Sequence, residues 1–116
     1  MKNTVVYIEP ADKKYPLAFN LNVMEEIQEH YGSLDEWGKA TQGDREPKVK
    51  DLKYGVLKML NEGIDMENES NGTNVPMLTS KQVGRIMTEV GIPKVLEAIQ
   101  DITIASVKTE DSGKNV

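Results

Sequence analysis

The 116-residue sequence contains no cysteine, which excludes disulfide bonds and metal sites built on thiolates. Aromatic residues are scarce, and one Trp and one Phe are too few for a surface that stacks nucleic-acid bases. No apolar run approaches the ~20 residues that a membrane-spanning helix needs, and the first residues, MKNTVVYIEP, do not resemble a signal peptide. We therefore expect a cytosolic protein with no membrane contact.

Basic residues are outnumbered by acidic ones, 14 Lys and Arg against 19 Asp and Glu, which gives a net charge of −5. This balance disfavours nucleic acid as a partner, because binding to phosphate backbones draws on clustered Lys and Arg. One cluster of basic residues does occur, but acidic residues interrupt it. The better interpretation is a solvated surface of mixed charge. The basic residues of this cluster are Arg45, Lys48, Lys50 and Lys53.

The longest helical pattern lies at Val49–Ile64. Its apolar side chains cover about 200° of the helix circumference, twice the stripe that a surface helix usually needs, which predicts the central helix of a small core. Gly55 lies on this apolar side and costs about 1 kcal/mol relative to Ala. We expect close approach of another helix to offset that cost, both here and at Gly84 in a later helix. Gly63 is expected to end or bend the central helix.

Two strand-like runs, Thr4–Glu9 and Tyr15–Leu21, are separated by a short polar loop and predict a β-hairpin. An isolated hairpin is marginally stable in water, so its Leu17 and Phe19 face should lie on the helices. Asn22 is predicted to cap the helix that follows. That helix should end at a glycine. The serine that follows is predicted to cap a second, shorter helix.

The C-terminal half begins with a polar, acidic stretch, Ile64–Val75, which is predicted to be a loop and the least ordered internal segment. Thr79 and Gln82 are spaced for a capping box at the start of the next helix. Pro93 is placed at the first turn of the last one. Ile102–Val107 is rich in β-branched residues, and its pattern fits either a helix or a strand.

Together these patterns predict a mainly α protein of the α+β class, with about five helices around the central helix and a short N-terminal β-hairpin. We expect one helical domain over residues 1–107, with the hairpin in residues 1–21. Residues 108–116 are expected to form a flexible tail.

Chemistry-bearing residues do not gather in the sequence. His30 is the single histidine and is expected to be solvated near a helix end, without the partners that a catalytic triad or metal site needs. The stretch Asp65–Glu69 resembles the start of a calcium loop, but Ser70 stands where that loop requires Gly. We therefore predict no catalytic, cofactor-binding or metal-binding residues, and no enzyme.

Three stretches form a recognisable order: YPLAFNLNVMEEIQEHYGSLDEW, LKYGVLKMLNEGIDMENE and LTSKQVGRIMTEVGIPKVLEAI. A strand-like entry ends in a helix and "YG", a central apolar helix is followed by "EGI", and "LT…QVG" precedes a final helix pair. This pattern spans roughly Tyr15 to Ile102. It resembles the small tail assembly chaperones of long-tailed bacteriophages, in particular those of Gram-positive hosts and gene-transfer agents.

The resemblance implies a non-enzymatic, mostly helical protein of the host cytoplasm that is absent from the mature virion. Such proteins bind the tape-measure protein and keep it soluble while tail-tube protein polymerises around it, so these two proteins are the expected partners. Self-association into a homo-oligomer is left open.

A chaperone for an extended apolar client needs apolar side chains that lie outside its own core. On the helical wheel the candidates are Trp37, Tyr54, Met66 and Ile104. Trp37 has two interpretations, an anchor for a partner or a lid over the core, because Trp is common both at interface hot spots and in cores.

Two alternatives to the chaperone stay open. One is a structural head–tail connector or tail-completion protein of a phage. The other is a small DNA-binding regulator, since short helix pairs can resemble a helix-turn-helix, although the acidic balance speaks against it.

Overall fold

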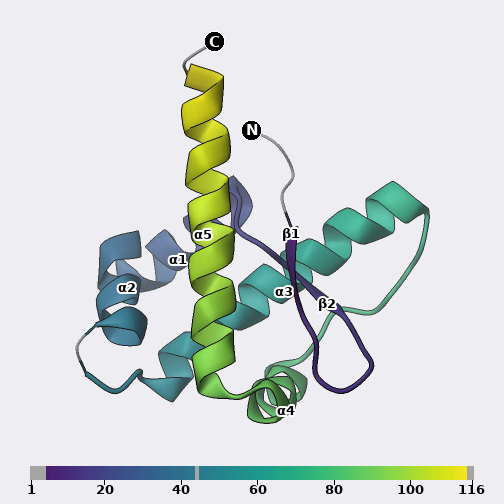
Figure 1. Ribbon diagram of the computed structural model, residues 1–116, viewed down its shortest axis with the longest axis horizontal. Coiled ribbons are helices and arrows are strands. Elements are labelled where there is room, and N and C mark those ends of the chain that lie inside the picture. The colour runs from purple at the N-terminus through teal and green to yellow at the C-terminus, as the bar shows by residue number, and fades with distance from the viewer. Residues whose placement is uncertain (1–4, 44, 115–116) are drawn as a thin grey trace.

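The structure, a computed structural model, describes residues 5–43 and 45–114, and the side chains of these as far as residue 106. This part of the chain forms five helices and a two-stranded antiparallel hairpin, which confirms the predicted fold class (Figure 1). The strands are β1 (Val5–Ile8) and β2 (Tyr15–Ala18). The helices are α1 (Leu21–Tyr31), α2 (Leu34–Gln42), α3 (Val49–Asn71), α4 (Ser80–Val90) and α5 (Ile92–Lys114).

The helix α3 is central, as its wide apolar surface predicted. It contacts β2, α1, α2 and α4, and Figure 1 shows it running across the molecule behind α5 and the hairpin. Leu52, Val56, Met59 and Leu60 are fully buried along it. A helix covered on several sides is what this pattern requires.

The helix α3 is also longer than the sequence pattern indicated. The prediction that Ile64–Val75 forms a loop was wrong for residues 64–71 and holds only for residues 72–75, because the helix continues to Asn71 and ends at Gly72, whose φ of +65° is left-handed. This last part lacks an apolar stripe, and polar side chains tie it to the hairpin instead. The Tyr7 hydroxyl in β1, for example, donates a hydrogen bond to the Glu67 carboxylate.

Two glycines of α3 mark places where another element crosses it closely. A Cβ at Gly55 would lie 2.2 Å from the Trp37 ring of α2, so the predicted close approach is confirmed there. A Cβ at Gly63 would lie 2.3 Å from the carbonyl oxygen of Pro16 in β2. The expectation that Gly63 ends or bends the helix was therefore wrong: this glycine makes room for the hairpin.

The hairpin is confirmed and is covered on both faces. Tyr7 lies opposite Pro16 in the antiparallel register. Leu17 and Phe19 are buried as predicted, but Pro16 and Ala18 are buried as well. Because successive strand residues point to opposite faces, β2 must be packed on both sides.

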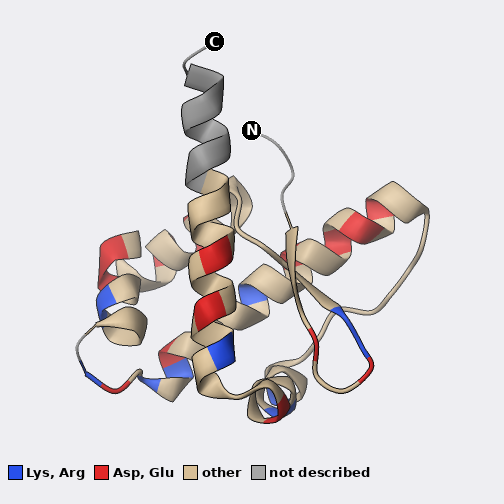
Figure 2. Ribbon diagram, viewed as in Figure 1, with Lys and Arg blue, Asp and Glu red and all other residues tan. Residues whose placement is uncertain are grey.

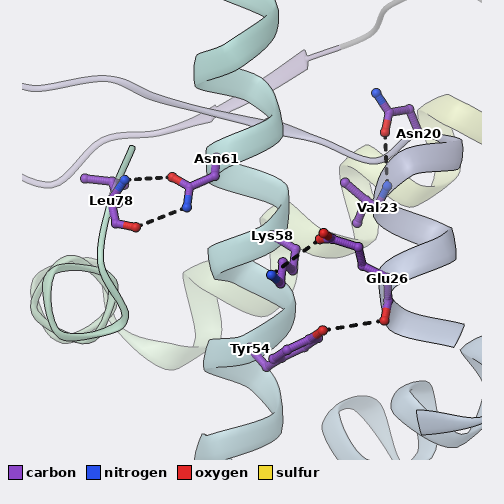
Figure 3. Close-up of polar contacts among 7 residues, drawn as sticks. All are labelled: Asn20, Val23, Glu26, Tyr54, Lys58, Asn61 and Leu78. Carbon is purple, nitrogen blue, oxygen red and sulfur yellow. Dashed lines mark hydrogen bonds and ion pairs between the residues drawn. The ribbon is translucent and has the colours of Figure 1, made fainter. Parts of the chain in front are cut away.

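Helix capping is predicted correctly at two of three places. The Ser33 hydroxyl accepts from a backbone N–H of α2, and Thr79 forms the predicted capping box at α4. For α1 the predicted cap was wrong, because Asn20 rather than Asn22 caps it, through a bond from the Val23 N–H (Figure 3). The helix therefore begins two residues earlier than predicted, about half a turn.

The last helix settles the choice left open by the sequence. Ile102–Val107 is helical, Ile102 is fully buried, and the Ser106 hydroxyl donates to the carbonyl oxygen of Phe19. The backbone is helical as far as Lys114, where a flexible tail had been expected from residue 108, and residues 115–116 lie outside the described part. None of the described helices has the length and apolar character to cross a membrane.

The third glycine of interest, Gly84 in α4, does not mark a close crossing, so that prediction was wrong. The nearest atom to an added Cβ would be Cδ of Lys53 at 3.5 Å, which is an ordinary contact with a flexible side chain. Gly55 and Gly84 can therefore be compared directly. A Cβ at Gly55 would overlap the Trp37 ring, whereas there is space for a Cβ at Gly84.

We predict that Gly55→Ala lowers the free energy of unfolding by about 1–3 kcal/mol, because the Trp37 ring must move out of a packed position. Gly84→Ala should raise it by up to about 1 kcal/mol, the helix-propensity gain of Ala over Gly. Urea unfolding followed by circular dichroism measures both values. A Gly55→Ala variant as stable as the wild type would contradict the close packing described here.

Candidate functional site

Trp37, the first predicted partner-binding residue, lies in the core. Its side chain is 4% exposed and packs against Gly55, and its Nε1 donates to the Asp51 carbonyl oxygen at 2.9 Å. The interpretation of Trp37 as a lid over the core therefore fits its position. An indole buried in this way offers no surface to a partner.

Tyr54, the second candidate, is half-buried and joins α1 to α3. Its ring stacks on His30 with centroids 4.2 Å apart, meets Tyr31 edge-on, and has the Lys58 ammonium 5.4 Å from its centre. Lys58 in turn forms an ion pair with Glu26 of α1 (Figure 3). Tyr54 therefore takes part mainly in the packing between α1 and α3.

A hydrogen bond beside Tyr54 also joins these two helices. The Tyr31 hydroxyl donates to the Asp51 carboxylate at 2.8 Å. Partial burial, together with this carboxylate, raises the pKa of Tyr31 well above its usual range, so the phenol stays neutral and keeps donating.

The remaining two candidates are more accessible. Met66 is half-buried, with its sulfur 3.6 Å from the Asn20 amide nitrogen, and Ile104 on α5 is 55% exposed. Tyr54 and Met66 lie about 18 Å apart along α3, twelve residues at about 1.5 Å each. With Trp37 buried as well, the four residues do not form a single surface.

The large apolar side chains that the structure does expose are mostly ones that the sequence pattern did not single out. They are Tyr7, Leu21, Val49, Val75, Met77 and Ile104. Val75 and Met77 are of particular interest because they flank Pro76 in one short segment between α3 and α4. That segment has no apolar periodicity, so only its composition could have drawn attention to it.

This segment, residues 73–79, is called the strap here, and two asparagines of α3 hold it. The Asn61 side chain accepts from the Leu78 N–H at 2.8 Å and donates to the Leu78 carbonyl at 3.1 Å (Figure 3). Asn68 makes the same pair of bonds with Val75, at 2.9 and 3.0 Å. The two asparagines are seven residues apart and so lie on one face of α3. Each side-chain amide therefore pairs with the strap backbone in the way that the backbone of a neighbouring strand would.

Beneath the strap lies a cleft of about 270 Å³, walled by the hairpin and the last turns of α3. Its lining is mainly apolar and includes Tyr15, Pro16, Ile64, Val75, Pro76 and Leu78. Val75 is 54% exposed at its border, and Met77 is 45% exposed on the same strap. We define the strap surface as Val75, Pro76, Met77 and this cleft, and we take it as the candidate site for binding another polypeptide.

The acidic residues of the sequence do not converge. Among the described residues no group of three or more His, Cys, Asp and Glu side chains is placed to hold a metal ion. Asp65 and Glu67, which begin the calcium-loop-like stretch, lie on the helix α3 rather than in a loop.

The chain matches no protein-family model, no curated protein and no solved structure.

Asn61 is predicted to hold the strap against α3. Replacing it by Leu removes both bonds to Leu78 and should lower stability by about 1–2 kcal/mol, near the sum of two hydrogen bonds. Hydrogen exchange should show the Leu78 amide losing protection. Asn22→Ala is the matched control, because Asn22 bonds only to Glu62 at the surface and should leave the strap unchanged. Unaltered protection of Leu78 in Asn61→Leu would show that the asparagine does not hold the strap.

Proposed function

We propose that this protein is a bacteriophage tail assembly chaperone, which binds the tape-measure protein in the host cytoplasm and promotes assembly of the tail tube. The proposal starts from the order of the three motifs between Tyr15 and Ile102. The single structural observation that carries it is the strap surface, where Val75 is exposed at the border of a mainly apolar cleft and Met77 is exposed on the same strap.

The chemistry of the strap surface suits a long apolar client. Such a client presents many different side chains along its length, and Met77 is unbranched and polarisable, so it adapts to partners of different shape. Asn61 and Asn68 fix the strap before any partner arrives. Fixing it in advance reduces the entropy lost on binding.

The predicted residues Met66 and Ile104 remain part of the proposal as accessible apolar positions, and Tyr54 remains as a half-buried one. Trp37 is left out because the core encloses it. A virion component is the competing proposal, and a chaperone that leaves before maturation differs from it in one respect: it is absent from purified particles.

The proposal is tested by expressing the chain together with the tape-measure protein of the same phage. Wild-type protein should keep the client soluble in an isolable complex. The double variant Val75→Ser, Met77→Ser should recover much less soluble client, because its strap loses two exposed apolar side chains. Leu21→Ser is the matched control, since Leu21 is also exposed but lies at the start of α1.

Two outcomes would count against different parts of the proposal. If the wild-type chain leaves the client insoluble, the chaperone function is wrong. If the double variant works as well as Leu21→Ser and the wild type, the function stands but the strap surface is not the binding site. Detection of the protein in purified virions would favour the structural alternative.

A further inference from the structure

A groove of about 390 Å³ runs between β1 and α5, closed at one end by the last turn of α4. Four consecutive residues, Val6 to Glu9, line one wall, and one side of α5 from Lys94 to Asp101 lines the other. No residue of β2 takes part, so the groove borders the free edge of β1. Figure 1 shows α5 standing beside β1.

The free edge of β1 offers backbone hydrogen-bonding groups. Tyr7 is paired with Pro16, which has no N–H, and the Pro16 carbonyl oxygen faces Gly63 of α3 instead of β1. This is therefore a non-hydrogen-bonded pair, in which both residues direct their N–H and C=O groups away from each other. Among the described residues, no hydrogen bond outside the hairpin reaches the Tyr7 backbone. An edge of this kind is a template for another strand.

The groove also carries a strong excess of negative charge. Four carboxylates line it, against one ammonium group. The acidic residues are Glu9, Glu89, Glu97 and Asp101, and the basic one is Lys94. None of the four carboxylates forms an ion pair within the described part of the chain. Figure 2 shows acidic positions on the turns of α5 that stand beside β1.

We propose that this groove binds an extended segment of a partner protein that is rich in Lys or Arg. The segment adds to β1 as a third strand, pairs with the outward backbone groups of Tyr7, and places its basic side chains against the carboxylates of α5. Main-chain bonds would supply affinity and the charges would supply selectivity, as in other cases of strand addition. A third strand also stabilises a two-stranded sheet. The inference rests on the groove alone and does not depend on the proposed function.

The test uses fluorescence anisotropy with the whole chain and a labelled heptapeptide of alternating Lys and Val. The same peptide methylated on alternate backbone nitrogens removes strand pairing, and a Glu–Val heptapeptide reverses the charge. We expect the Lys–Val peptide to bind, the methylated peptide to bind about tenfold more weakly, and the Glu–Val peptide not to bind. No binding of the Lys–Val peptide, or equal binding of all three, would overturn the proposal.

Protein variants separate the contribution of strand pairing from the contribution of charge. Tyr7→Pro removes the outward N–H and should weaken binding about tenfold, whereas Tyr7→Phe, which loses only the hydroxyl bond to Glu67, should bind as the wild type does. Glu97→Gln with Asp101→Asn leaves the hairpin untouched and should weaken binding and its dependence on salt. Unchanged binding in the charge variant would overturn the assignment, as would wild-type affinity for the Lys–Val peptide in a folded Tyr7→Pro variant.

Discussion

The arrangement of the helices depends on the contact between the Trp37 indole and the bare backbone of Gly55. Any side chain at that position would overlap the ring, since a Cβ would lie 2.2 Å from it. The same indole donates to the Asp51 carbonyl, and the Asp51 carboxylate accepts from Tyr31. Two neighbouring turns of α3 therefore fix both α1 and α2. The rest of α3 is then free to contact the hairpin, the strap and α4.

Local signals predicted much of this fold from the sequence. The caps at Ser33 and Thr79, the hairpin and the central helix are all readable because each depends on residues a few positions apart. The full length of α3 could not be predicted from the sequence. Its last turns carry no apolar stripe and are held by polar contacts with the hairpin, while Gly63 reflects a crossing by Pro16 far away in the sequence. A pattern within one helix cannot report a partner in another element.

The candidate site was less predictable for the same reason. A helical wheel selects residues outside the predicted core face, and it selected Trp37, whose burial depends on a glycine in a different helix. It passed over Val75 and Met77 because the strap has no periodicity. Their exposure depends on Asn61 and Asn68, which order the strap through side-chain bonds from the preceding helix. Asparagines two turns apart, facing a Pro-containing segment, are a signal that sequence analysis could use.

The packing of Trp37 is the central claim, and the chain's one Trp makes it directly measurable, since a single indole N–H resonance reports it. A buried, hydrogen-bonded indole exchanges its proton only when the structure opens. The measurement is the exchange rate of that proton in native conditions. We predict a protection free energy equal to the global free energy of unfolding from urea titration. Exchange at the rate of a free indole would show that Trp37 does not close this core.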